Sequence, residues 1–143
     1  MQIQRKNRRA GFTLAELMVV IVIIGLLATL VVPNVMKKLF TANITKAKAD
    51  IVAISGAIDQ YAIENAGRYP DSLEALVTPD ANGFTFLRQE TVPKDPWGNE
   101  YVYEPPSSGS QKFRVLSYGK DNAPGGEGDD ADIDSVKIQN QEQ

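Results

Sequence analysis

Hydrophobic and polar positions mark out one unusually long apolar stretch near the start of the chain. From Leu17 to Met36, 20 consecutive residues carry no formal charge, and most of them are Val, Ile or Leu. As an α-helix rising about 1.5 Å per residue, the stretch would be about 30 Å long, the thickness of the hydrocarbon core of a bilayer. The alternative is a buried core helix, but so small a chain could hardly cover it on all sides. The pattern therefore predicts a membrane-spanning helix.

Beyond the apolar stretch, hydrophobic residues recur at alternating spacings of three and four, which is typical of one apolar face of a helix. These positions are Ile44, Ala47, Ile51, Ile54, Ile58 and Tyr61. Gly67 suits a helix end, so we predict one helix from about Thr13 to about Asn65. Its second half is predicted to pack on a small sheet. A dimeric coiled coil is the less favoured alternative, because three heptads or fewer rarely hold alone.

The rest of the chain has short runs that are typical of strands, separated by Pro and Gly. Strands are predicted at Phe84–Leu87, Glu100–Tyr103 and Lys112–Ser117. A short helix is predicted near Leu73–Leu76, capped by Ser72 or Asp71. Trp97 lies within dense turn chemistry and is interpreted as a core or turn anchor. The predicted fold class is α+β, with a long N-terminal helix packed on a small antiparallel sheet.

Composition and charge narrow the functions that the chain can have. The 143 residues include no Cys and no His, which excludes disulfides, thiol catalysis, Ser-His-Asp triads and the usual zinc sites. Residues 1–11 carry a charge of +4, so the rest of the chain carries −7 out of the total of −3. This acidic body argues against nucleic acid as a partner. The basic start predicts a cytoplasmic amino end, with the chain after Met36 translocated.

A small-residue pair precedes the apolar stretch instead of following it, as it would in a secretory signal. Residues 8–17 read Arg-Arg-Ala-Gly-Phe-Thr-Leu-Ala-Glu-Leu. This segment resembles the prepilins, the family of type IV pilins and of the pseudopilins of type II secretion. The resemblance implies that a prepilin peptidase cuts between Gly11 and Phe12, and that the new amino group of Phe12 is methylated. The apolar helix would be kept, first in the lipid bilayer and then as the core of a fibre.

Glu16 places a carboxylate near the start of the apolar helix, which costs a few kcal/mol unless the carboxylate is paired or solvated. The residues alone leave both readings open, because Glu16 could lie at headgroup depth. The resemblance implies that Glu16 pairs with the amino group of Phe12, in the same or a neighbouring subunit, during assembly. Pro33 removes one helical hydrogen bond, which predicts a kink or melted stretch near Leu30–Pro33.

A second group of residues narrows the resemblance. The Gly-Arg-Tyr-Pro segment that ends at Pro70, then Val92–Asn99 and Tyr101, are similar to the major pseudopilins of type II secretion. This resemblance implies a single-pass protein of the bacterial inner membrane with a periplasmic C-terminal domain. It implies a helical homopolymer that also contacts minor pseudopilins and an inner-membrane assembly platform, and no enzymatic activity. The alternatives are a type IV pilin, a minor pseudopilin, or a signal-anchored periplasmic enzyme or calcium-binding module.

The acidic loop, residues 116–132, combines several carboxylates with Gly. Calcium prefers six to eight oxygen ligands, which such a loop can supply, but acidic Gly-rich segments also stay disordered. The spacing is not that of an EF-hand. The resemblance implies one structural Ca²⁺ ion. The ligands that it implies are the Tyr118 carbonyl, Asp121, Asp129, Asp130 and, more weakly, Asp132.

These expectations divide the chain into five parts. They are a leader (1–11), a transmembrane and fibre-core helix (12–36), its amphipathic continuation (37–66), a β-rich periplasmic domain (67–134) and a disordered Gln/Asn-rich tail (135–143).

Overall fold

The computed structural model describes residues 11–107 and 112–141, and its longest element is helix α1, Leu14–Glu64. The single helix predicted from Thr13 to Asn65 is therefore confirmed. The helix ends in a tight turn in which Ala66 and Gly67 have φ angles of 56° and 82°. The backbone N–H of Gly67 donates to the Ala62 carbonyl at 2.7 Å, which satisfies a carbonyl at the helix end.

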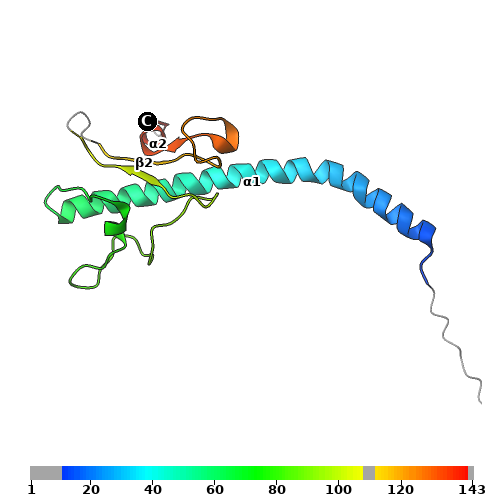
Figure 1. The fold of residues 1–143 in the computed structure, drawn as a ribbon, viewed down its shortest axis with the longest axis horizontal. Helices are drawn as coiled ribbons and strands as arrows, with labels where there is room; N and C mark the ends of the chain where they lie inside the picture. The colour runs from blue at the N-terminus through cyan, green and yellow to red at the C-terminus, as the bar shows by residue number, and fades with distance from the viewer. Residues whose placement is uncertain (1–10, 108–111, 142–143) are drawn as a thin grey trace, which may run out of the picture. The chain divides into compact units, whose positions relative to one another are not determined.

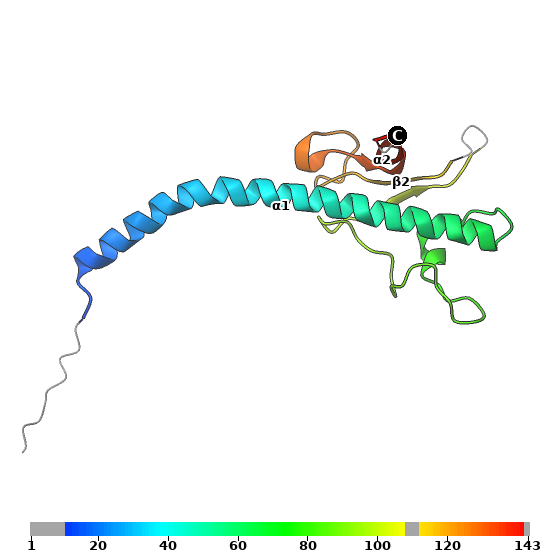
Figure 2. The ribbon, with the colours of Figure 1, turned by 180° about the vertical axis from the view of Figure 1, so that it is seen from behind.

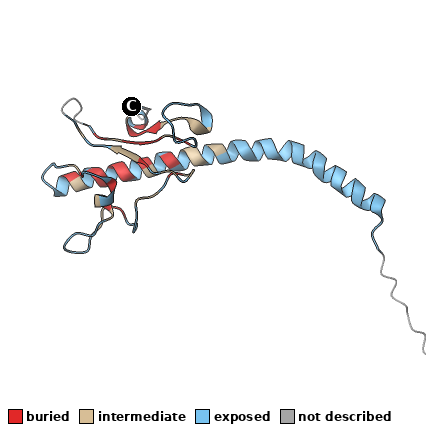
Figure 3. Ribbon diagram, in the orientation of Figure 1, coloured by how far each residue is buried: buried red, intermediate tan, exposed pale blue. Residues whose placement is uncertain are grey.

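The chain divides into two compact units, Met1–Lys38 and Leu39–Gln143. In the first unit, each described residue from Gly11 to Lys38 is exposed (Figure 3). This part of α1 is long and apolar enough to cross a membrane. The helix continues through Pro33, so of the predicted kink or melted stretch near Leu30–Pro33 the melted alternative is wrong. The Asn34 side-chain amide donates to the Leu30 carbonyl, one turn earlier in the helix, at 3.0 Å.

The second unit contains a three-stranded antiparallel sheet in the order β1-β2-β3 (Figure 1). Its elements are η1 (Leu73–Leu76), β1 (Val102–Glu104), β2 (Arg114–Ser117), η2 (Gly128–Asp130), β3 (Ile133–Asp134) and α2 (Ser135–Gln141). In the register, Tyr103 lies opposite Val115 and Leu116 lies opposite Asp134. The predicted class, a long helix with a small antiparallel sheet, is confirmed.

The core of the second unit forms around the apolar face of α1 that the spacing predicts. Ile51, Ile54 and Ile58 are fully buried, and they belong to one cluster with Leu76 and Val115. Figures 1 and 2 show the sheet on one side of this part of α1 and η1 on the other. One helix face thus organises both the sheet and the segment that leads into it.

The strand predicted at Phe84–Leu87 is wrong, because this segment pairs with no strand among the described residues and consists of irregular backbone and bends. Its backbone follows Asp80, whose Oδ1 accepts the Phe84 amide at 2.8 Å, and the Phe84 and Phe86 rings meet edge to face. The predicted short helix is present as η1, but the Ser72 side chain makes no capping hydrogen bond to it. The two later strands are confirmed within two residues of their predicted starts.

The predicted disordered tail is also wrong as far as Gln141, because Ser135–Gln141 forms helix α2. Ile138 is buried in the core cluster, and the Ser135 hydroxyl accepts the backbone N–H of Val115 at 3.1 Å. The Gln/Asn-rich composition outweighed Ile138 in the sequence analysis, although this apolar residue faces the core. The last two residues of the predicted tail lie outside the described residues.

Candidate functional site

The processing motif lies at the start of α1. Gly11 and Phe12 precede the helix, and the Phe12 side chain is 82% exposed. The predicted cleavage point therefore lies in an exposed segment outside the helix, and the leader before Gly11 lies outside the described residues. Exposed segments outside regular structure are the ones that proteases cut most readily.

Glu16 closes a capping box with Thr13. The Thr13 backbone N–H donates to Glu16 Oε2 at 2.8 Å, and the Glu16 backbone N–H donates to Thr13 Oγ1 at 3.2 Å. The Thr13 hydroxyl also donates to Glu16 Oε2 at 3.0 Å. These bonds satisfy backbone donors at the helix start that would otherwise be unpaired. The signal that could have predicted this contact is the Thr-x-x-Glu spacing at the start of the helix, which is typical of a capping box.

In the acidic loop the predicted ligands fall into separate contacts. Asp121 Oδ1 accepts the Ala123 amide at 3.1 Å, and both carboxylate oxygens of Asp132 accept the Gly125 amide at 3.0 Å. No group of three acidic side chains poised to hold a metal ion occurs among residues 11–107 and 112–141. Asp121 and Asp132 are therefore paired with separate backbone amides of the loop and do not form one carboxylate cluster.

Two glycines let the ends of the loop approach closely. A Cβ atom added to Gly119 would lie 2.7 Å from the Asp129 carbonyl oxygen, and one added to Gly126 would lie 2.4 Å from that of Asp130. Both glycines have positive φ angles, 69° and 84°. The backbone of Asp129 and Asp130 consequently lies against Gly119, the residue after Tyr118. Three of the five predicted ligands are brought into one neighbourhood in this way.

The chemistry of this neighbourhood fits a cation that prefers oxygen. Asp129 Oδ1 is shielded from solvent and accepts no hydrogen bond within the described part of the chain. A buried carboxylate oxygen without a partner is costly, and a bound cation removes that cost. Carboxylate and carbonyl oxygens are the ligands that Ca²⁺ prefers, and a flexible Gly-rich backbone can adapt to its variable geometry.

Asp95 organises the turn that the sequence predicts from its dense Pro and Gly chemistry. Asp95 is 4% exposed, and its Oδ1 accepts the amides of Trp97 at 3.1 Å and Asn99 at 2.8 Å. Its Oδ2 accepts the hydroxyl of Ser117, a fully buried residue, at 2.6 Å. Trp97 packs against the core cluster, so its interpretation as an anchor is confirmed. The Asp-Pro-Trp-Gly-Asn sequence predicts the turn, but no pattern in the sequence indicates that Asp95 contacts Ser117.

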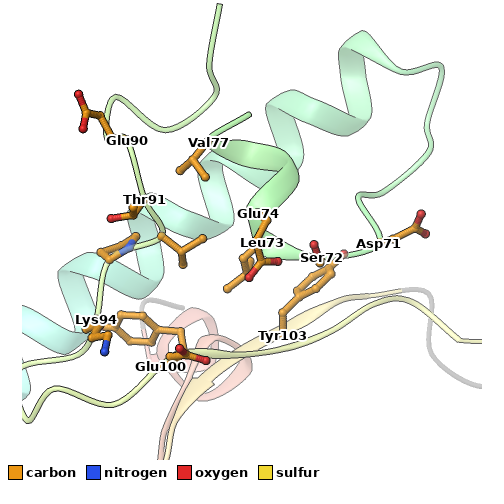
Figure 4. Close-up of a pocket in the computed structure, with 13 residues that line it drawn as sticks. Asp71, Ser72, Leu73, Glu74, Val77, Glu90, Thr91, Lys94, Glu100 and Tyr103 are labelled. Atoms are coloured by element: carbon orange, nitrogen blue, oxygen red, sulfur yellow. The ribbon is translucent and has the colours of Figure 1, made fainter. Parts of the chain in front are cut away.

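A cavity of about 780 Å³ lies between residues 71–77, residues 90–94 and the start of β1 (Figure 4). Four carboxylates and one amine line it: Asp71, Glu74, Glu90, Glu100 and Lys94. The pKa of Tyr103, at the same wall, is raised to about 12 by burial and by the nearby Tyr69 and Asp71. The lining is mostly acidic, and no other feature of the described residues indicates a ligand. We therefore assign no function to this cavity.

Comparison with known protein families gives matches to the start of the chain and to the part that follows it. The family described as type II secretion system protein G matches residues 34–136, and the prokaryotic N-terminal methylation motif matches residues 6–32. The type II secretion system core protein G of Vibrio cholerae is 42% identical over 144 residues, covering 95% of this chain and 97% of the relative. That of Pseudomonas aeruginosa is 42% identical over 140 residues, covering 90% and 96%.

A solved structure supports the same assignment. The major pseudopilin from the type 2 secretion system of enterohaemorrhagic Escherichia coli superposes with a TM-score of 0.55 at 30% identity. The match covers 75% of this chain and 97% of that structure. With its methylation motif, its exposed apolar helix and its sheet, the chain belongs to the type II secretion system protein G family, and it is a major pseudopilin, a structural subunit rather than an enzyme.

Proposed function

We propose that this chain is cut between Gly11 and Phe12, methylated at Phe12 and polymerised into a periplasmic pseudopilus. The observation that carries the proposal is the first part of α1, whose large apolar side chains from Leu14 to Leu39 are each about half exposed or more. An apolar surface of this extent is not stable in water. It must be covered by lipid before assembly and by neighbouring subunits afterwards.

Glu16 supplies the one charge in this surface near its start. While the subunit is in the bilayer, the capping box with Thr13 holds the carboxylate in its own helix. In the fibre, the methylated amino group of Phe12 is a cation of opposite charge close to the same level of the helix. Pairing with the amino group of a neighbour neutralises both charges in the apolar core and sets the axial register of the subunits.

The basic leader and the acidic body indicate the orientation of the chain. A leader of +4 before the apolar helix favours a cytoplasmic amino end, with the second unit in the periplasm. The partners in this proposal are the prepilin peptidase, the inner-membrane assembly platform, the minor pseudopilins and further copies of this chain. The relatives that carry the protein G name favour the major subunit over a type IV pilin or a minor pseudopilin.

Substitution of Glu16 tests the assembly role. We expect Glu16→Ala to abolish fibres while cleavage at Gly11 and membrane insertion continue, because neither needs the carboxylate. The measurement is the amount of sedimentable fibre against the amount of processed membrane subunit. Thr13→Ala is the matched control, since it weakens the capping box but keeps the carboxylate, and it should still assemble. Fibres of normal yield from Glu16→Ala would overturn the role of Glu16.

We further propose that the second unit binds one Ca²⁺ ion in the acidic loop. Asp129, whose Oδ1 is unpaired, Asp121, Asp130 and the Tyr118 carbonyl are the residues that would hold it, with Asp132 at the edge. When bound, the ion supplies positive charge that offsets the repulsion among these carboxylates. The residues themselves fold the loop back, through Gly119 and Gly126, onto the end of β2.

Thermal unfolding with calcium and with chelator tests the ion. A ligand at 100 times its dissociation constant stabilises the folded state by about 2.7 kcal/mol, which raises the midpoint by several degrees. We expect this rise with Ca²⁺ and a smaller one with Mg²⁺, which demands a tighter octahedral site. Asp129→Asn should reduce the rise. An unchanged midpoint would exclude calcium stabilisation and leave the assembly proposal intact.

A further inference from the structure

We propose that Asp95, Asn99 and Ser117, the last at the start of the acidic loop, are positioning residues for the rest of that loop, and that they couple ion binding in the loop to the turn formed by residues 95–99. The part of this proposal that concerns ion binding rests on the calcium site proposed above. The linkage between the turn and the loop consists of hydrogen bonds among described residues.

The linkage converges on one residue, Gly119. The Ser117 hydroxyl donates to Asp95 Oδ2 at 2.6 Å and accepts the Gly119 amide at 3.1 Å. The side-chain amide of Asn99 donates to the Gly119 carbonyl at 2.9 Å. Both polar groups of the Gly119 backbone are thereby bonded to the turn, directly or through one hydroxyl. Asp95 also holds Asn99, because it accepts the Asn99 amide.

On its other side, Gly119 touches the part of the loop that carries the proposed ligands. Its α-carbon lies against the backbone of Asp129 and Asp130, where a Cβ would meet the Asp129 carbonyl oxygen at 2.7 Å. The next amide, that of Lys120, donates to the same carbonyl at 2.9 Å. A displacement of Gly119 must therefore move Asp129, whose Oδ1 is the unpaired oxygen.

Burial makes this linkage rigid. Asp95 and Ser117 are 4% and 0% exposed, and Gly119 is also buried. Removing one partner from a buried network leaves the others unsatisfied, so the network resists partial opening. Groups that orient the ligands of a metal ion without touching it typically change the affinity by 10- to 100-fold when they are removed. Asn99 and Ser117 have this position relative to the loop.

The fluorescence of Trp97 can report on this linkage. Trp97 is the only Trp in the chain, and its amide is bonded to Asp95 Oδ1 within the same turn. The linkage predicts that calcium changes the fluorescence of Trp97, although Trp97 has no atom among the proposed ligands. The turn headed by Asp80 is an internal control, because Asp80 Oδ1 accepts the Asn82 and Phe84 amides with the same spacing along the chain.

The experiment uses the full chain in detergent micelles, titrated with CaCl₂ while calorimetry and Trp97 fluorescence are recorded. We expect the two signals to give one Kd in the unsubstituted protein. Asn99→Ala and Ser117→Ala should raise the Kd about tenfold. Asn99→Ala should also reduce the fluorescence change, whereas Asp80→Asn should alter the Kd by less than about twofold. Hydrogen exchange of the Lys120 amide, without calcium, should be faster in Asn99→Ala than in Asp80→Asn.

The outcomes separate this inference from the calcium proposal. Binding by calorimetry with a silent Trp97 and an unchanged Kd in Asn99→Ala would overturn the coupling and leave the calcium site standing. Absence of heat in every variant would overturn the calcium site. In that case hydrogen exchange decides the linkage: faster exchange of Lys120 in Asn99→Ala supports it, and unchanged exchange overturns it.

Discussion

Asp134 shows how one side chain can hold the edge of a small sheet. Burial alone would raise the pKa of this carboxyl, but the Arg114 guanidinium and the Val136 amide donate to it, and the net effect is a lowered pKa. A carboxylate with a lowered pKa stabilises the folded state above its ordinary pKa of 3.8. The stabilisation is lost as the pH falls through the lower, folded-state value.

We therefore expect Asp134→Asn to destabilise residues 39–143 by about 1–3 kcal/mol at pH 7. The difference from the unsubstituted fragment should shrink at pH 3, where the carboxyl begins to protonate. Urea unfolding at the two pH values measures it. Glu104→Gln is the control, because Glu104 contacts the same Arg114 but is exposed, so its loss should cost less than about 1 kcal/mol. Equal losses from both substitutions would contradict the role assigned to Asp134.

At this scale the sequence predicted residues better than it predicted their partners. Glu16 and Trp97 stood out because each is chemically unusual where it occurs, whereas Asp129 was named only through the resemblance. Their partners did not, although the three-residue spacing between Thr13 and Glu16 is a capping pattern that could have indicated one of them. Asp95 and Ser117 are 22 residues apart and meet only because β2 brings them together. No local pattern carries that information.

Among the elements, the acidic loop depends most on backbone geometry. Gly125 and Gly126 have similar φ angles, 99° and 84°, but only at Gly126 would a Cβ meet another atom, the Asp130 carbonyl oxygen at 2.4 Å. Gly125→Ala should therefore cost about 1–2 kcal/mol from the left-handed backbone alone. Gly126→Ala should cost about 1–3 kcal/mol more, because Asp130 must move.

Paired thermal unfolding of the two alanine variants, with and without Ca²⁺, measures this difference. We expect Gly126→Ala to lose most of the calcium-dependent rise in midpoint and Gly125→Ala to keep it. The pair is matched in residue type, substitution and backbone strain, so the contact with Asp130 is what remains. Similar midpoints and similar calcium responses would show that this close approach does not shape the loop.

The elements that the sequence predicted well are those with a repeated pattern. The α1 helix carries its apolar spacing over several turns, and β2 lies in a run where Phe113 and Val115 alternate with charged residues. The errors fall where the pattern is short. Strand β3 has two residues, and Phe84–Leu87 has suitable residue types but no neighbouring strand. Strand formation depends on a partner elsewhere in the chain, which composition does not report.

At the scale of the whole molecule, the two units differ in how many of their described residues are buried. Every buried residue of the described chain lies between Ala47 and Ile138, within the second unit. Among the described residues, the second unit thus contains the whole core, whereas the first has an apolar surface and no buried residue. We accordingly assign stability to the part of α1 whose hydrophobic side chains lie on one face. Assembly is assigned to the part whose hydrophobic side chains lie on all sides of the helix.

This division predicts the behaviour of a fragment of residues 39–143. We expect it to unfold cooperatively and to stay monomeric at concentrations where the processed full chain, removed from detergent, forms fibres. The reason is that the fragment keeps each buried side chain but loses the exposed apolar residues from Phe12 to Met36. Sedimentation analysis and urea unfolding give the two readouts. A fragment that polymerises would place the main subunit contact in the second unit, and a fragment that does not fold would show that its core needs the first part of α1.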